Sequence, residues 1–242
     1  MTSLNMNERA RELADVMEEE STGLRVTVTT LPGGARVIDA GIATDGGLSA
    51  GLLLAEICMG GLGDVEYASL SLGGESWTGV QVRTDHPAIS CMASQYAGWA
   101  IHLDKYFAMG SGPLRAHARV EKELFERLNY AEQATAGVLV LEGHDLPTDE
   151  VAAYVARKAN LSPGQLTFVI APTASLAGGT QISARILETG LHKMETLGFD
   201  VRQVMSGIGT APIPPVAKSD LRGIGHTNDC VLYGGQARYT VK

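Results

Sequence analysis

An arginine and a glutamate stand three residues apart in a stretch with the pattern of an amphipathic helix. The stretch, GGTQISARILETGLHKMETLG at residues 178–198, places Arg185 and Glu188 on a polar arc opposite an apolar half. Two residues of this kind and spacing form either a surface ion pair worth roughly a few tenths of a kcal/mol or the charged part of an active site. The pattern alone favours the surface pair.

Two neighbours in the same stretch bear on this choice. Gly190 lies inside the helical pattern, where glycine costs up to about 1 kcal/mol relative to alanine. That cost is easier to understand if another group approaches the helix closely at this point. His192, one turn beyond Glu188, is either a second proton carrier or, as the pattern favours, a solvated histidine.

Other motifs are weaker. Ser111 lies in a Gly-Ser-Gly turn before a predicted helix at Pro113, which indicates either a plain tight turn or an anion site, with the turn favoured. Neither a P-loop nor a dinucleotide fingerprint is present, so the sequence implies neither ATP nor NAD. The six histidines and three distant cysteines lack metal-ligand spacing and a disulfide pattern. We therefore expect no metal.

Composition limits the class of protein. The 242 residues are 45% apolar and include 29 glycines, which indicates a compact protein with one large core or two small ones. The net charge of −8 and the lack of a basic run argue against nucleic-acid binding. No apolar run reaches the length of a membrane-spanning helix or follows a signal-peptide layout. We expect a cytoplasmic protein without a membrane partner.

Periodicity along the chain predicts an α/β fold. The runs 24–31 and 35–42 flank Pro-Gly-Gly and predict a hairpin, and a buried helix is expected from residue 46. Strand and helix patterns then alternate through the second half, which is typical of α/β layers. The Gly/Pro-rich stretch 207–235 predicts a long loop, and a loop of that length usually has a function.

Longer strings resemble a known family. They are GGLSAGLLLAEICMGGLG, TDHPAISCMASQYAGWAI, MGSGPLRA, QISARILETGLHKM and APIPPVAKSDLRGIGHTNDCVLYGG. Together they resemble methenyltetrahydromethanopterin cyclohydrolases. The resemblance implies a two-domain α/β protein with the substrate pocket between the domains, here at residues 1–130 and 131–242, and a cytoplasmic homotrimer without a metal or redox cofactor.

The resemblance also implies a reaction. The family reversibly hydrolyses 5,10-methenyl-tetrahydromethanopterin to the 5-formyl form in the one-carbon metabolism of methanogenesis or formaldehyde oxidation. Arg185 and Glu188 match the catalytic arginine and glutamate of the family, which reverses the preference for a surface pair. Glu188 would take a proton from the attacking water and return it to the leaving ring nitrogen. Arg185 would hold Glu188, keep it ionised and withdraw electron density from the carrier.

Further residues are implied as parts of the substrate site. The resemblance assigns pterin contacts or pocket positions to Asp85, Ser94, Gln95, Ser111, Lys218 and Asp220. Family members continue beyond the position that matches the final TVK, so two alternatives stay open. One is a pterin-binding protein that has lost turnover with a shortened C-terminal region. The other is a tetrahydrofolate cyclohydrolase, a family that normally carries NAD(P) motifs not found in this sequence.

Overall fold

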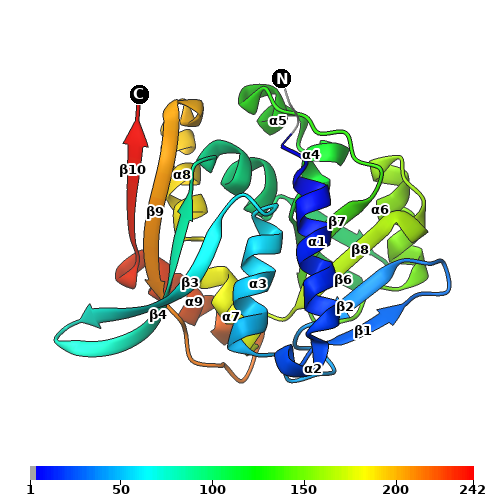
Figure 1. Ribbon diagram of the computed structural model, residues 1–242, viewed down its shortest axis with the longest axis horizontal. Coiled ribbons are helices and arrows are strands. Elements are labelled where there is room, and N and C mark those ends of the chain that lie inside the picture. Colours follow the sequence, from blue (N-terminus) through cyan, green and yellow to red (C-terminus); the bar gives the residue numbers. More distant parts are fainter. Residues whose placement is uncertain (1–3) are drawn as a thin grey trace.

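Two β-sheets form the frame of the protein, and the computed structural model describes residues 4–242 (Figure 1). Sheet A has the strand order β1-β2-β8-β7-β6-β5, and sheet B the order β10-β9-β4-β3. The strands of sheet A are β1 (Thr27–Thr30), β2 (Arg36–Asp39), β5 (Trp99–Leu103), β6 (Tyr106–Ser111), β7 (Gly137–Gly143) and β8 (Leu166–Ala171). Those of sheet B are β3 (Asp64–Leu72), β4 (Glu75–Thr84), β9 (Val204–Pro212) and β10 (Gln236–Val241).

Sheet A is a mixed sheet whose central strands, β7 and β8, are buried on both faces. Strands β2, β8 and β7 run parallel, β1 and β6 pair antiparallel with β2 and β7, and β5 pairs antiparallel with β6. Along β7, Val138 and Val140 pack into one apolar cluster, and Leu139 and Leu141 into the cluster on the other face. Successive side chains of a strand point to opposite faces, so a run of apolar residues requires helices on both. The predicted α/β class is confirmed.

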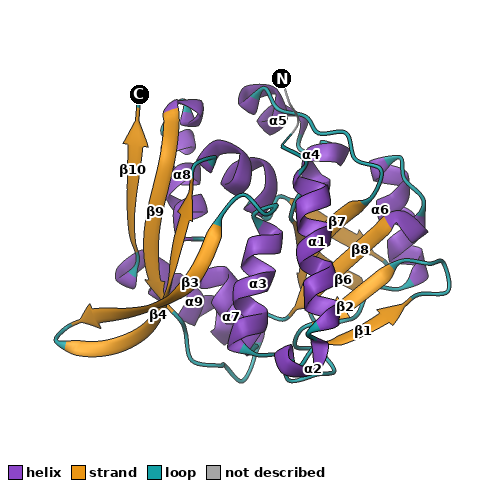
Figure 2. Ribbon diagram, in the orientation of Figure 1, coloured by secondary structure: helices purple, strands orange, loops and turns teal. Residues whose placement is uncertain are grey.

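Helices supply those layers. Figure 2 shows α1 (Met6–Glu19) and α3 (Leu48–Cys58) side by side in front of sheet A, where both contact β7. On the opposite face α6 (Asp149–Ala159) contributes Val151 and Val155 to the core. The short helices α2 (Ser21–Leu24) and η2 (Pro163–Gln165) lie before β1 and β8.

Sheet B is antiparallel, and one of its faces packs against helices. Its core includes Val80 and Val82 from β4 together with side chains of η1 (Ala88–Gln95), α5 (Lys122–Leu128) and α8 (Ile186–Thr196). The segment η1 is a π-helix, a rare form that occurs frequently at functional sites. The remaining elements are α4 (Leu114–Ala118), α7 (Leu176–Ser183), η3 (Val201–Gln203) and α9 (Asp220–Gly234).

Three sequence predictions compare directly with these elements. The hairpin is confirmed, since Thr30 pairs with Arg36 across a tight connection between β1 and β2. The single helix over 178–198 is wrong, because the chain turns at Ala184 and Arg185 between α7 and α8. The loop over 207–235 is also wrong, because β9 and α9 occupy most of it. Glycine is tolerated in α9 partly because Gly223 packs against the backbone of residue 174.

The predicted domain boundary near residue 130 stays a prediction. Strands β7 and β8 follow that point in the sequence, yet they pair with β6 and β2, which precede it. Sheet B likewise combines β3 and β4 with β9 and β10. Each sheet therefore takes strands from both halves of the chain.

Candidate active site

Arg185 and Glu188 are buried where α7 ends and α8 begins. Each residue is 7% exposed, so the interpretation as a surface ion pair is wrong. Arg185 has φ −79° and ψ 8°, and its N–H donates to the carbonyl of Ile182, three residues back. This tight turn breaks the helix and directs the arginine toward the interior, away from the solvent side that a continuous helix would give it.

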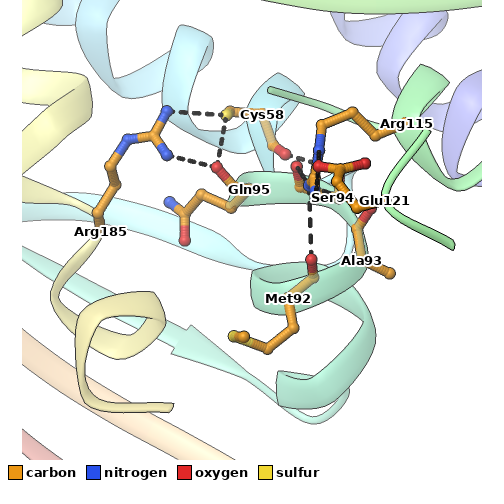
Figure 3. A network of polar contacts seen from close by, with 8 residues as sticks. All are labelled: Cys58, Met92, Ala93, Ser94, Gln95, Arg115, Glu121 and Arg185. Carbon is orange, nitrogen blue, oxygen red and sulfur yellow. Dashed lines mark hydrogen bonds and ion pairs between the residues drawn. The ribbon is translucent and has the colours of Figure 1, made fainter. Parts of the chain in front are cut away.

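The Arg185 guanidinium joins the ends of several elements (Figure 3). Its Nε donates to Gln181 Oε1 at 2.8 Å, and its Nη1 donates to the Gln95 carbonyl at the end of η1. Its Nη2 donates to Ser111 Oγ at 3.1 Å, at the end of β6, and lies 3.7 Å from Cys58 Sγ at the end of α3. The planar fork of an arginine suits several acceptors at once, so the side chain is held in one orientation.

Glu188 has a different environment. No hydrogen bond or ion pair to its carboxylate is found within residues 4–242, although the side chain is buried. Burial raises the pKa of Glu188 above its ordinary value of 4.5, and the charges of Arg185, His192 and Arg115 oppose that increase. An ionised carboxylate held in this way is costly for the fold, and such groups are concentrated at functional sites.

A hollow of about 470 Å³ reaches α8 at His192, one helical turn beyond Glu188. It is bounded by the end of η1, by α5 and by α8, and Met92, Tyr96, Glu121 and His192 are among its lining residues. His192 lies one helical turn from Glu188 and is exposed, and its ring centroid is 5.0 Å from that of Tyr96. Neither Arg185 nor Glu188 is itself among the lining residues.

Three of the predicted substrate residues belong to the support of the site. Ser94 and Gln95 are fully buried: Ser94 Oγ donates to the Cys58 carbonyl at 2.7 Å, and Gln95 Nε2 donates to the Ala184 carbonyl at 3.2 Å. Ser111 is 1% exposed and accepts from Arg185. These bonds join η1, α3 and β6 around the arginine. Direct contact of these three with a pterin stays a prediction.

The other three lie elsewhere. Asp85 is exposed and lines a separate groove of about 750 Å³. Asp220 begins α9, accepts from the N–H of Ala174 at 2.7 Å and lies 3.0 Å from His144 Nε2. Lys218 is exposed in the connection before α9. Across the described chain none of these three side chains contacts Arg185 or Glu188, and their substrate role stays a prediction.

Sequence reasoning missed Arg115, Tyr96 and Cys58. Arg115 is fully buried, and its carbon Cζ lies 5.2 Å from the centroid of the Tyr96 ring. All three residues occur in the strings that carry the family resemblance, but nothing in their local pattern indicates a place near Arg185 and Glu188. The burial of Arg115 in the short helix α4 would have pointed to the site, but that burial depends on neighbouring elements and cannot be inferred from the sequence.

The close approach expected at Gly190 is made by Tyr239 of β10. The Tyr239 hydroxyl donates to the Leu187 carbonyl at 2.8 Å, and a Cβ on residue 190 would overlap that hydroxyl. We expect Gly190→Ala to lower the free energy of unfolding by about 1–2 kcal/mol, because the clash exceeds the gain in helix propensity. Urea unfolding measures the change.

A matched control lies in α9. Gly225 is exposed in a helix with nothing within 4 Å of its Cβ position, so Gly225→Ala should be neutral or stabilising by up to about 1 kcal/mol. In a Tyr239→Phe background the cost of Gly190→Ala should shrink. If Gly190→Ala were as harmless as Gly225→Ala, the packing of β10 on α8 would not have the described form.

Within residues 4–242 no group of three or more His, Cys, Asp and Glu side chains is arranged to hold a metal ion. No helix in that range is both long and apolar enough to cross a membrane.

The fold and site define a mixed α/β protein with a buried arginine and, three residues further on, a buried carboxylate that has no hydrogen-bond partner within residues 4–242. A protein-family model described as "Cyclohydrolase (MCH)" matches residues 5–242. The methenyltetrahydromethanopterin cyclohydrolase of Methanosarcina mazei is 45% identical over 238 residues, which cover 98% of this chain and 74% of that protein. The same-named protein of Methylobacillus flagellatus is 46% identical over 239 residues, covering 98% and 72%. The chain belongs to the methenyltetrahydromethanopterin cyclohydrolase family, which confirms the resemblance.

Proposed function

We propose that this protein reversibly hydrolyses 5,10-methenyl-tetrahydromethanopterin to 5-formyl-tetrahydromethanopterin. Family membership supports the substrate and the reaction type. The observation that carries the proposal for this chain is the Glu188 carboxylate, which is buried without a hydrogen-bond partner in the described residues and lies near the fixed charge of Arg185. A group placed in this way is poised to exchange protons with a bound substrate.

The reaction follows from these two side chains. A water oxygen attacks the cationic methenyl carbon while ionised Glu188 takes a proton from that water. The bond from this carbon to one ring nitrogen then breaks, and the electron pair goes to that nitrogen. Glu188 returns its proton there, the carbon remains on the other nitrogen as a formyl group, and the second proton of the water is released. The positive charge of Arg185 favours the ionised form of Glu188 before each turnover.

We place the pterin in the hollow beside η1, α5 and α8, which is the proposed substrate pocket. Its lining combines the ring of Tyr96 with polar side chains such as Glu121 and His192. A flat ring system with polar edges suits a wall that offers one aromatic face and several polar groups. Glu188 does not line this hollow, so the proposal includes a shift of the Tyr96–His192 contact that opens a way from the hollow to the carboxylate.

One experiment tests the proposal. The protein is mixed with the methenyl carrier, and the loss of the methenyl absorbance is followed, with the product identified by NMR. Decay that is faster than in a protein-free control and yields the 5-formyl product is the expected result. Binding without decay would favour the alternative of a pterin-binding protein. Faster turnover of the tetrahydrofolate analogue would favour the alternative of a tetrahydrofolate cyclohydrolase.

We further propose a cytoplasmic homotrimer that serves methanogenesis or formaldehyde oxidation. Large apolar side chains support an assembly: Leu221 and Tyr233 on α9 are 82% and 84% exposed, and Trp77 on β4 is 48% exposed. The mass of the protein in solution, measured by light scattering, tests the trimer. A monomer at micromolar concentration would contradict it.

A further inference from the structure

A second arginine is buried next to the proposed catalytic pair. Arg115 of α4 is fully buried, and its Nε donates to Glu121 Oε1 at 2.7 Å. Its Nη1 donates to the Ser94 carbonyl at 3.0 Å and lies within 3.5 Å of the carbonyls of Met92 and Ala93. An arginine is costly to bury, and here its charge is offset by one carboxylate and a group of backbone oxygens.

The two buried arginines act on the same turn of backbone. The last carbonyls of any helix lack partners within the helix. In η1 two arginines donate to these carbonyls from opposite sides (Figure 3): Arg115 to those of residues 92–94 and Arg185 to that of Gln95. A movement of this turn therefore changes the place of the acceptor that orients Arg185.

Arg115 also supports the wall of the hollow. Its guanidinium carbon lies 5.2 Å from the centroid of Tyr96, and the Tyr96 ring in turn contacts His192 at 5.0 Å. A cation over an aromatic ring at this distance is attractive. Glu121, the ion-pair partner of Arg115, lines the same hollow. One side chain thus connects the backbone of η1, the aromatic wall and a carboxylate.

We propose that Arg115 is a positioning residue for the hydrolysis: it fixes the end of η1 and the Tyr96 ring, and it supplies positive charge to the surroundings of Glu188. This inference rests on the proposed function. Nothing in the geometry requires Arg115 to touch the substrate, since it is fully buried behind Tyr96 and Glu121.

Several titratable groups besides Arg115 interact with Glu188. Arg185 and His192 lower the pKa of Glu188, while Glu188 raises the pKa of Cys58 in α3, Cys91 in η1 and Tyr239 in β10. Arg115 lowers the pKa of Glu188, so removal of its charge raises that pKa. Hydrolysis needs ionised Glu188, so activity is lost as the pH falls through this pKa. The acid limb of the kcat profile then moves to higher pH in a variant without the charge.

The test compares Arg115→Met with Arg115→Lys. We expect both to lower kcat at least about tenfold, because neither can hold Glu121 and the η1 carbonyls together. Only Arg115→Met should move the acid limb, to higher pH, since the lysine keeps the charge. If Arg115 only supported the fold, the pH profile of kcat would have its acid limb at the same pH in both variants. An unshifted limb in folded Arg115→Met would overturn the proposal.

Glu121→Gln provides an independent variant if Arg115→Met does not fold. It removes the anion that offsets Arg115, so the acid limb should move to lower pH, opposite to the first shift. A ¹³C NMR titration of Glu188, assigned by comparison with Glu188→Gln, reports the same shifts without turnover. Failure of wild-type hydrolysis therefore refutes the proposed function alone. Absence of a shift in Glu121→Gln by both methods contradicts the role of Arg115.

Discussion

Glu188→Gln should lose at least about 100-fold in kcat for hydrolysis of the methenyl carrier, the range expected when a general base is removed. Glutamine keeps the shape of the side chain but cannot accept the proton of the attacking water or return it to the leaving nitrogen. Stopped-flow absorbance of the methenyl group measures the loss. Binding of the carrier, followed by equilibrium titration, should change much less than kcat, because the removed interaction matters mainly in the transition state.

The same variant should be more stable than the parent at neutral pH. Burial raises the pKa of Glu188 in the folded protein above the ordinary value of 4.5 that applies to the unfolded chain. The folded state therefore binds this proton more tightly than the unfolded chain does. The free energy of unfolding falls as the pH rises from the unfolded-state pKa to the folded-state pKa of Glu188, and above the folded-state pKa the full cost of burying the ionised carboxylate is present. Glutamine removes this cost, and the melting temperature should rise by about 2–4 °C per kcal/mol regained.

The gain should disappear in acid, where Glu188 of the parent is protonated. Glu19→Gln, on the exposed end of α1, is a control that should leave both kcat and the pH dependence of stability close to those of the parent. If Glu188→Gln retained near-normal hydrolysis, the carboxylate would not be the base. If it were destabilised at neutral pH, the carboxylate would have a stabilising partner in the folded protein.

Much of the fold could be predicted from periodicity, and the failures have physical causes. The run of apolar residues in β7 indicates a strand buried on both faces, as found. The break at Ala184 and Arg185 leaves no trace in composition, because neither residue disfavours a helix. It is stabilised by tertiary contacts of the arginine. In α9, the glycines suggested a loop, although packing against the region of residue 174 stabilises a helix.

The site, like the fold, could be predicted only in part from the sequence. Spacing identified Arg185 and Glu188 as a pair, but a helical wheel places them on the solvent side, and only the break explains their burial. Ser94 and Gln95 were selected as substrate contacts, while the next residue, Tyr96, lines the hollow. A π-helix has more residues in each turn than an α-helix, so the α-helical period cannot say which side chains of η1 face outward.

Arg185→Met should have the second largest effect, with kcat lowered by about 100-fold. The change removes the charge that favours ionised Glu188 and releases Gln181, Gln95 and Ser111 from a common partner. A small displacement of a catalytic group is sufficient for a loss of this size. The acceptors left inside the protein should also lower the free energy of unfolding by about 1–3 kcal/mol. Steady-state kinetics and urea unfolding measure the two losses.

Arg185→Lys separates the effect of charge from that of geometry. Lysine retains a positive charge but lacks the planar fork, so it cannot reach the three acceptors together. Its acid limb should stay near that of the parent, whereas in Arg185→Met the pKa of Glu188 rises and the limb moves to higher pH. Arg202→Met, which removes an exposed pair with Asp200, should change stability by less than about 1 kcal/mol and leave kcat intact. Full activity in Arg185→Lys would mean that charge alone is required, and the hydrogen bonds that fix the guanidinium would then have no part in turnover.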